Sequence, residues 1–301
     1  MIGTLVPALL TALFLSACLA GHSEPTWTHL SSARGELQNP GGSTQQTGAI
    51  VAHLSKSTAA DIVISYRVHA PALVWIRRTA SGWTRSVIDK DFLPLEAGGA
   101  AHDIDGDGDL DVVFGEDASG NKLYWWENPY PRFDPEVPWI RRVIKADGAN
   151  QQHDLIVGDF KGTGKPQLVF WNQRARTLFI ADVPADPKRA ASWPLDVVYS
   201  GQAGEQVGNA AQYAEGLDAF DIDGDGRTDL CAGNFWFKYD GGRFRPVRVG
   251  TSGHRNHRLR WRSWRASRAS PIWRSSCSRW RDACWSMFVP GAPSSASSSR
   301  R

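Results

Sequence analysis

The chain has 301 residues but only four cysteines and two methionines. Cys231 is the single cysteine between the apolar N-terminus and residue 250, so no disulfide framework can hold this part together. A lone cysteine within a β-like run is most often a small buried hydrophobe. No segment beyond residue 20 has the apolar period of a helix, so the sequence does not predict a helical domain.

Lysine is missing from residues 251–301, which carry eleven Arg, one acidic residue and therefore a net charge of +10. Since the whole chain has a net charge of +3, the first 250 residues carry −7. The acidic part and the basic tail therefore need separate interpretations.

The N-terminus has no Lys or Arg before its apolar run. Residues 1–20 are too short for a comfortable transmembrane helix and are interpreted as an export signal. Leu15-Ser16-Ala17-Cys18 resembles a bacterial lipobox, in which the cysteine is diacylated; simple cleavage after Ala20 is the alternative. We favour a lipid anchor at Cys18, which would be the sole membrane contact. The predicted location is the outer membrane as a lipoprotein, or the periplasm or exterior.

The acidic stretch HDIDGDGDLDVV at 102–113 returns in part as FDIDGDGRTDLC at 220–231. Two segments, AHLSKSTAADIVIS and GDFKGTGKPQLVFW, keep the same frame with fewer acids. The first positions of the four copies are His53, Asp103, Asp159 and Asp221. A second landmark, an aromatic residue before a β-like run, follows each copy at Trp83, Trp139, Trp193 and Phe244. The chain is therefore built from repeats.

Each repeat contains four short β-like runs separated by Gly, Asn and Pro. Four strands in a unit of about 40–60 residues are typical of a β-propeller blade. We predict an all-β, incomplete propeller over residues 48–250, preceded by an N-terminal segment at 21–47 with an orphan outer strand at Trp27. The predicted blades are 48–90, 98–147, 153–200 and 210–250.

The two acidic loops are predicted to bind one Ca²⁺ each. Their pattern offers carboxylates at positions one, three, five and nine and a carbonyl at seven, and Ca²⁺ takes about six to eight oxygen ligands. Without a metal, these carboxylates would repel one another, which makes a merely solvated acidic turn the weaker alternative. The predicted ligands are Asp103, Asp105, Asp107, Asp111 and the carbonyl of Asp109, and Asp221, Asp223, Asp225, Asp229 and the carbonyl of Arg227.

An EF-hand is excluded, because position twelve is Phe114 or Ala232 instead of Glu, and strand-like residues follow both loops. The loops and their strand context resemble the FG-GAP or VCBS repeats, the blades of integrin-α-like propellers. The resemblance covers about residues 48–250 and is strongest at 98–147 and 210–240. It implies Ca²⁺ in the hairpin between the first two strands of a blade.

The weaker copies have lost ligands, with His53, Ser55 and Ser57 in one and Lys161, Thr163 and Gln167 in the other. We predict no metal in either loop. The metal of the acidic loops is expected to be structural, fixing a long hairpin with little apolar surface.

Residues 251–301 combine Arg with five Trp and thirteen Ser in a low-complexity segment that we expect to be disordered. Arg interleaved with Trp would suit nucleic acid or an anionic membrane. However, Arg, Trp, Ser, Ala and Pro without Lys is also the composition of a GC-rich gene read out of frame. We favour the out-of-frame interpretation and predict no nucleic-acid partner.

For function, we predict a non-enzymatic binding or adhesion scaffold for carbohydrate or surface-protein partners, because no nucleophile–base set or zinc spacing is present. The alternative is a polysaccharide-acting, lyase-like enzyme that uses the propeller centre. Its catalytic candidates are His153 and Glu215, each six residues ahead of its repeat anchor, with Asp154 and Asp218 close by. Repeated tryptophans are candidates for sugar stacking, but we favour packing between blades for Trp125, Trp126, Trp171 and Trp236.

Overall fold

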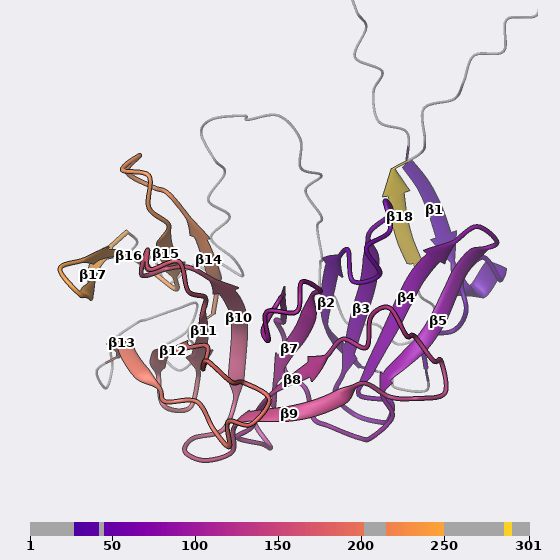
Figure 1. Ribbon diagram of the computed structural model, residues 1–301, viewed down its shortest axis with the longest axis horizontal. Coiled ribbons are helices and arrows are strands. Elements are labelled where there is room, and N and C mark those ends of the chain that lie inside the picture. The colour runs from indigo at the N-terminus through magenta and orange to yellow at the C-terminus, as the bar shows by residue number, and fades with distance from the viewer. Residues whose placement is uncertain (1–26, 42–44, 202–214, 250–285, 291–301) are drawn as a thin grey trace, which may run out of the picture. The chain divides into compact units, whose positions relative to one another are not determined.

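The computed structural model describes residues 27–41, 45–201, 215–249 and 286–290 (Figure 1). The predicted export signal, Cys18 and most of the predicted tail lie outside these residues. Within the described ranges there is no α-helix, and the one helical element is the 3₁₀ turn η2 (Ser32–Arg34). None of the described segments is a helix long and apolar enough to cross a membrane.

The chain divides into two compact units, Gln38–Ala283 and a smaller one made of Met1–Leu37 and Cys284–Arg301. In the smaller unit, β1 (Trp27–Ser31) pairs antiparallel with β18 (Ser286–Pro290), and Trp27 lies opposite Pro290. A strand therefore begins at Trp27, and its partner comes from the segment expected to be an unstructured tail.

The larger unit contains four antiparallel sheets of four strands, each in simple chain order, which are the blades of a propeller. Blade 1 is β2 (Gln46–Ala52), β3 (Asp61–Tyr66), β4 (Leu73–Thr79) and β5 (Gly82–Asp89). Blade 2 is β6 (Ala100–His102), β7 (Asp111–Gly115), β8 (Leu123–Glu127) and β9 (Ile140–Lys145). Blade 3 is β10 (Gln152–Gly158), β11 (Gln167–Asn172), β12 (Thr177–Asp182) and β13 (Asp196–Ser200). Blade 4 is β14 (Leu217–Phe220), β15 (Asp229–Ala232), β16 (Phe235–Asp240) and β17 (Arg243–Arg248). The predicted all-β fold with four recognisable blades is confirmed.

The second strand of every blade is buried along its whole length, as in DIVISY of β3 and QLVFWN of β11. Three of them, β3, β7 and β11, are rich in Val, Ile and Phe, which suit a pleated and buried surface, and β15 has the shorter run Leu-Cys-Ala. A strand covered on both faces shows a continuous apolar run instead of alternation. The sequence of β3, β7, β11 and β15 therefore already reflects a position inside a stack of sheets.

Three apolar clusters join successive blades, and none joins blade 1 to blade 4 in the part of the chain that is described, so the ring is open there. Trp126, Trp125 and Trp171 fill the first, second and third cluster with no exposed surface, which confirms their predicted packing role and removes them as sugar platforms. Cys231 on β15 is buried, as predicted for a small hydrophobe.

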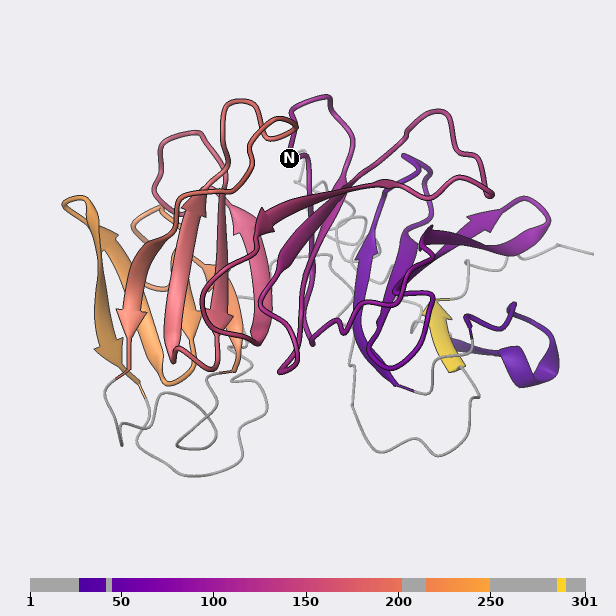
Figure 2. The same ribbon diagram turned by 90° about the horizontal axis from the view of Figure 1, so that it is seen from below.

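The first strands of neighbouring blades contact one another, β2 with β6, β6 with β10 and β10 with β14. They therefore form the inner edge along which the blades are arranged, and Figure 2 shows the sheets following each other in chain order. Residues at the two ends of the first strands are consequently brought together from different blades. The acidic loops leave one end of these strands, and a polar pocket lies at the other.

Candidate functional site

The first two strands of each blade are joined by a loop that carries the predicted pattern. We name these the blade-1 to blade-4 loops, residues 53–61, 103–111, 159–167 and 221–229. In the blade-2 loop, one carboxylate oxygen from each of Asp103, Asp105 and Asp107 lies within 4.8 Å of the others. Asp221, Asp223 and Asp225 form the same group in the blade-4 loop. Both groups are the first three acids of the predicted ligand sets.

The first aspartate of each acidic loop closes a tight turn. Asp103 accepts hydrogen bonds from the N–H groups of Gly106 and Gly108 at 2.8 and 3.0 Å, and Asp221 accepts the equivalent bonds at 2.7 and 2.9 Å. The two glycines of the blade-2 loop have φ of 77° and 90°, which only glycine adopts without strain. Position one therefore shapes the backbone in addition to offering oxygen to a cation.

The ninth position is a buried backbone anchor. Asp111 accepts the N–H groups of Ile104 at 3.0 Å and Asn128 at 2.8 Å, and Asp229 accepts that of Ile222 at 3.0 Å. Burial raises the pKa of Asp111 to about 8 and also raises that of Asp229. These two predicted ligands thus already hold the start of β7 and β15 to their loops.

Two lysines contact acids at the third and fifth loop positions, and no sequence pattern predicted these contacts. The Lys188 Nζ, from the loop after β12, lies 2.7 Å from Asp105 Oδ2. The Lys238 Nζ, on β16, lies 2.7 Å from Asp225 Oδ2 and also contacts Asp223. The carboxylates raise the pKa of both lysines, so Lys188 is a charged partner for the third position of the blade-2 loop and Lys238 for the third and fifth positions of the blade-4 loop.

The residues of the acidic loops fit a calcium ion. The donors are carboxylates and a backbone carbonyl, which is the all-oxygen set that Ca²⁺ takes. Asp109 is also buried beside the group, and its Oδ1 atom has no hydrogen-bond partner. Burial and the neighbouring Asp107 raise the pKa of Asp109 to about 6. The five acids of the blade-2 loop therefore outnumber the two lysines that act on it, Lys188 at Asp105 and Lys56 near Asp109.

The blade-3 loop keeps the backbone pattern of the acidic loops. Asp159 at position one accepts the N–H groups of Thr163 at 2.9 Å and Gly164 at 2.7 Å. Gln167 at position nine is fully buried and accepts the N–H of Phe160 at 2.9 Å. The turn therefore forms without acids at positions three and five.

Those positions are filled differently in the two weaker copies. Lys161, at position three of the blade-3 loop, places its Nζ 2.9 Å from Asp182 Oδ2. In the blade-1 loop, the ninth residue Asp61 accepts the N–H of Ser55 at 2.7 Å, and His53 Nδ1 lies 2.9 Å from the carbonyl of Ser57. The donor sets that Ca²⁺ prefers are thus confined to the blade-2 and blade-4 loops among the described hairpins.

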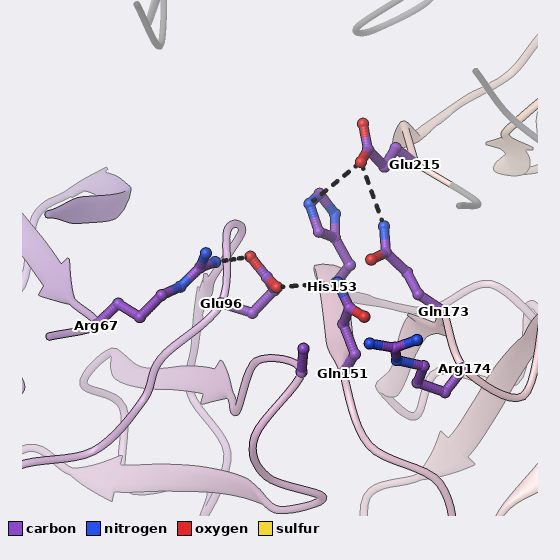
Figure 3. A pocket seen from close by; sticks show the side chains of 8 residues that line it. Arg67, Glu96, Gln151, His153, Gln173, Arg174 and Glu215 are labelled. Atoms are coloured by element: carbon purple, nitrogen blue, oxygen red, sulfur yellow. Dashed lines mark hydrogen bonds and ion pairs between the residues drawn. The ribbon is translucent and has the colours of Figure 1, made fainter. Parts of the chain in front are cut away.

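A polar pocket of about 280 Å³ collects side chains from all four blades (Figure 3). They come from the starts of the first strands and from the loops that follow the second strands, which lie at the same end of an antiparallel sheet. The lining residues are Arg67, Glu96, Ala118, Gln151, His153, Gln173, Arg174 and Glu215. All but one of these side chains can donate or accept hydrogen bonds.

Glu96 is a buried carboxylate that the pocket neutralises. It forms an ion pair with Arg67 and accepts the N–H of Ala97 at 2.8 Å. Gln151 Nε2 lies 3.4 Å from its second oxygen, and Arg67 Nε is 3.1 Å from Asp117 Oδ2. A buried charge persists only when it is paired and hydrogen-bonded, so Glu96 and Arg67 act here as one polar unit.

His153 lies between two carboxylates. Its Nδ1 atom is 3.1 Å from Asp154 Oδ2, and its Nε2 atom is 4.0 Å from Glu215 Oε1. Burial, the largest single influence, lowers the pKa of His153, but Asp154, Glu96 and Glu215 outweigh it and leave that pKa raised. The imidazole therefore carries its proton to a higher pH than an ordinary histidine does.

A β-bulge positions these groups. The register between β10 and β11 shifts between His153 and Leu155, and Asp154 adopts a φ of 41° within the shift. Asp154 Oδ2 accepts the N–H of Gly216 at 2.7 Å, which ties blade 3 to blade 4. Gly98 permits the close approach, since a Cβ there would lie 2.7 Å from the Asp154 Cα. Bulges and strained backbone are common beside functional sites, where they redirect side chains.

The structure thus brings together His153, Asp154 and Glu215, three of the four residues singled out for the enzyme alternative. Asp218 is exposed on β14 and does not line the pocket. Sequence reasoning missed Arg67, Glu96 and Gln173. The spacing could have located part of this pocket, because polar residues stand six positions after the ninth loop position in three blades. They are Arg67, Asp117 and Gln173.

The fold and the loops define a propeller-type protein whose blades carry acidic hairpin loops. The model of the FG-GAP-like repeat family matches residues 103–183, which span the blade-2 loop, the last three strands of blade 2 and the first three strands of blade 3. This match confirms the predicted resemblance to FG-GAP repeats. No curated protein sequence matches the chain significantly.

Solved structures with a similar arrangement of strands share little sequence with this chain. The V. cholerae biofilm matrix protein Bap1 is 14% identical with a TM-score of 0.39, over 67% of this chain and 30% of that one. The rhamnogalacturonan lyase YesW is 13% identical with a TM-score of 0.38, over 72% and 42%. The Aleuria aurantia lectin AAL, in complex with Fucα1-6GlcNAc, is 13% identical with a TM-score of 0.37, over 68% and 62%. The chain spans less than half of the first two, and TM-scores this low carry no argument about its ligands.

Proposed function

We propose that this protein is an exported, calcium-stabilised binding scaffold that holds a carbohydrate in the polar pocket, and that it is not an enzyme. The observation that carries the proposal is the lining of that pocket. Arg174 and His153 are donors, Glu215 is an acceptor, and Gln151 is both. Sugar hydroxyls donate and accept at once, so a mixed lining suits them. A surface protein with a polar contact patch is the other partner of this class.

Calcium at the blade-2 and blade-4 loops would hold the hairpins that carry the first strands to the pocket. Extracellular calcium modules bind at about 10⁻⁴–10⁻³ M, so such sites fill outside the cell. This agrees with the proposed export signal at residues 1–20 and with a lipid anchor at Cys18. Metabolic labelling with a palmitate analogue tests the anchor, since Cys18→Ser should abolish labelling if the lipobox interpretation is right.

Calorimetric titration with a panel of oligosaccharides, in calcium, tests the pocket. Glu215→Gln and Gln151→Ala should each weaken the binding of any oligosaccharide by about tenfold, because each removes a hydrogen bond, and a charge-assisted one for Glu215. Asp218→Asn is the matched control, because it changes an exposed carboxylate of the same blade away from the lining. Glycan binding that is equal in all variants, or no glycan binding at all, contradicts the proposal.

The lyase-like alternative rests on one specific observation, the imidazole of His153 held between Asp154 and Glu215, which raise its pKa. A lyase needs a base near the acidic carbon of a uronate and a donor for the leaving oxygen. Depolymerisation of an acidic polysaccharide, followed by the absorbance of unsaturated ends, is the assay. Activity that disappears in both His153→Ala and Glu215→Ala would favour the enzyme, and activity that survives both clears these residues.

A further inference from the structure

A charged residue stands at the same place in the third strand of every blade. In each third strand, one residue pairs with the second residue of the second strand, and the charged residue comes directly after it. In blade 1 this pair is Ile76 with Ile62, and in blade 2 it is Trp126 with Val112. The corresponding pairs in the other blades are Ala181 with Leu168 and Phe237 with Leu230. The four charged residues are Arg77, Glu127, Asp182 and Lys238.

In three blades this charge has an internal counter-charge. Glu127 accepts from Arg142 Nε at 3.0 Å and from Lys188 at 2.9 Å. Asp182 pairs with Lys161 at 2.9 Å. Lys238 pairs with the acids of its own loop, as described above. In blades 2, 3 and 4, the charged residue at this position of the third strand therefore forms an ion pair within the protein.

Arg77 is the exception in blade 1. It forms no ion pair with any carboxylate of the described residues, and its buried Nε has no hydrogen-bond partner. Its guanidinium carbon lies 4.9 Å from the ring centre of Trp75 and 5.4 Å from that of Phe133. The charge of Arg77 offsets part of the burial effect on Asp61, but the two side chains do not pair. A buried donor without a partner costs stability, which a ligand can recover.

Arg77 lines a second cavity of about 280 Å³, between blades 1 and 2. The walls are aromatic, from Trp75, Trp139 and the half-buried Phe133. The polar groups of the lining are Arg77, Arg85, Gln38, the hydroxyls of Thr84 and Ser86, and the Trp75 indole, which lies beside the buried Asp61. Arg85 Nε already donates to the carbonyl of Pro40 at 2.8 Å, whereas Arg77 Nε has no hydrogen-bond partner. The one acid in the lining, Asp134, is exposed. The lining therefore carries a net positive charge, from two arginines against one exposed carboxylate.

The next interface along the chain shows what completes such a site. Opposite Trp125 on the neighbouring strand is Arg142, which stacks on that ring and is neutralised by Glu127. Opposite the equivalent Trp75 is the small Ser86, and Arg77 replaces the glutamate. Blade 1 has therefore kept the aromatic ring and an arginine but lost the carboxylate that fills the space in blade 2.

We infer that this cavity binds a hexuronate unit of an acidic polysaccharide, whose carboxylate pairs with Arg77 as Glu127 pairs with Arg142. Two parallel N–H···O bonds from a guanidinium suit a carboxylate, and the aromatic walls suit the apolar face of a pyranose ring. An Asp or Glu side chain has no ring face to lay against Trp75, Phe133 and Trp139, which favours a sugar over an acidic peptide. This inference rests on the proposed function as a glycan-binding scaffold and names a second site and its ligand class.

Calorimetric titration of the full chain in calcium, with an oligogalacturonate and with the same oligomer after its carboxyl groups are reduced to hydroxymethyl groups, tests the inference. The acid should bind at least about tenfold more tightly than the reduced oligomer, and Arg77→Gln should remove that difference, because a charge-assisted hydrogen bond is lost. Arg78→Gln is the matched control, since Arg78 is the exposed neighbour on the same strand and lies over Trp83. Equal binding of the two oligomers, or an undiminished preference in Arg77→Gln, overturns the inference.

A second variant protects the test against a folding defect. Arg77→Glu with Ser86→Arg copies the Glu127–Arg142 pair of blade 2 into blade 1, so the cavity should close and uronate binding should vanish while the thermal midpoint is kept or raised. Retained uronate binding in this double variant overturns the inference. A glutamate-rich peptide that binds more tightly than the oligogalacturonate overturns the sugar assignment. Neutral glycans that bind and respond to Glu215→Gln, together with an oligogalacturonate that binds no more tightly than its reduced form, leave the proposed function standing while the inference fails. An absence of all glycan binding ends both.

Discussion

The blade-2 and blade-3 loops have the same backbone pattern and opposite charge. In both, the first carboxylate accepts N–H groups of the turn, and the ninth side chain accepts an N–H from the second position. They differ at the third and fifth positions, where Asp105 and Asp107 stand in one loop and Lys161 and Thr163 in the other. The acids of a single loop therefore have two roles, since positions one and nine build the turn, whereas positions three and five add negative charge that the turn does not need and that we propose for calcium.

The largest expected effect comes from removing the side chain at the ninth position, which accepts backbone N–H groups in both loops. Gln167→Ala should lower the free energy of unfolding by about 2–4 kcal/mol, equally in calcium and in chelator, because it leaves buried N–H groups without an acceptor. Asp111→Ala should cost a similar amount in chelator and more in calcium, because Asp111 is also a predicted ligand. Denaturant unfolding in both buffers measures this. If the loss of unfolding free energy in Gln167→Ala depended on calcium, the ninth position would not act on the turn alone, and the assignment of separate roles to the loop positions would be wrong.

The next largest effect is the stabilisation by calcium, which tests the third and fifth positions, where the two loops differ. Calcium at ten times its dissociation constant should stabilise the protein by about 1.4 kcal/mol for each loop, and raise the thermal midpoint by a few degrees. The double variant Asp105→Asn with Asp107→Asn should remove the part of this calcium stabilisation that comes from the blade-2 loop. Thr163→Asn, at the fifth position of the blade-3 loop, is the control and should leave the shift unchanged. A midpoint that is identical in calcium and chelator would falsify the calcium proposal.

The smallest effect distinguishes the two acidic loops from each other. Lys238→Met removes an exposed ammonium group from Asp223 and Asp225, so calcium should bind the blade-4 loop a few-fold more tightly, in line with the small energies of exposed ion pairs. Calcium titration calorimetry measures the change. The same substitution at Lys188 should tighten the blade-2 loop and leave the blade-4 loop unaffected. An unchanged or weaker affinity in Lys238→Met would show that the lysine does not compete with the ion.

Much of the fold could be predicted because the residues that define the repeat are those that form the turn between the first two strands of each blade. The spacing of Asp103, Asp159 and Asp221 located three of the four hairpins, and the runs after them located the second strands. The fourth copy was found through Asp61, which keeps the ninth position although His53 has replaced the first acid. Positions fixed by local hydrogen bonds leave a regular trace in the sequence.

The contents of the sites were harder to predict because they depend on contacts between blades. Lys188 reaches Asp105 from the following blade, and no local pattern links the two. His153 and Glu215 were found because each precedes its repeat anchor by the same distance. Glu96 and Arg67 were missed because their pairing depends on how two neighbouring sheets are stacked. The unpaired charge of Arg77 becomes visible only when the four third strands are compared in register.

The three apolar clusters also determine how this protein responds to damage. Each cluster belongs to one pair of neighbouring blades, so the stability of the larger unit is a sum of blade terms and nearest-neighbour terms, as in a one-dimensional chain of coupled elements. A cavity made at Trp126 weakens the coupling of blades 1 and 2, whereas one made at Trp171 weakens that of blades 3 and 4. Loosening therefore spreads from blade to blade, and the interface that holds the Arg77 cavity can fail while the blade-4 loop stays intact.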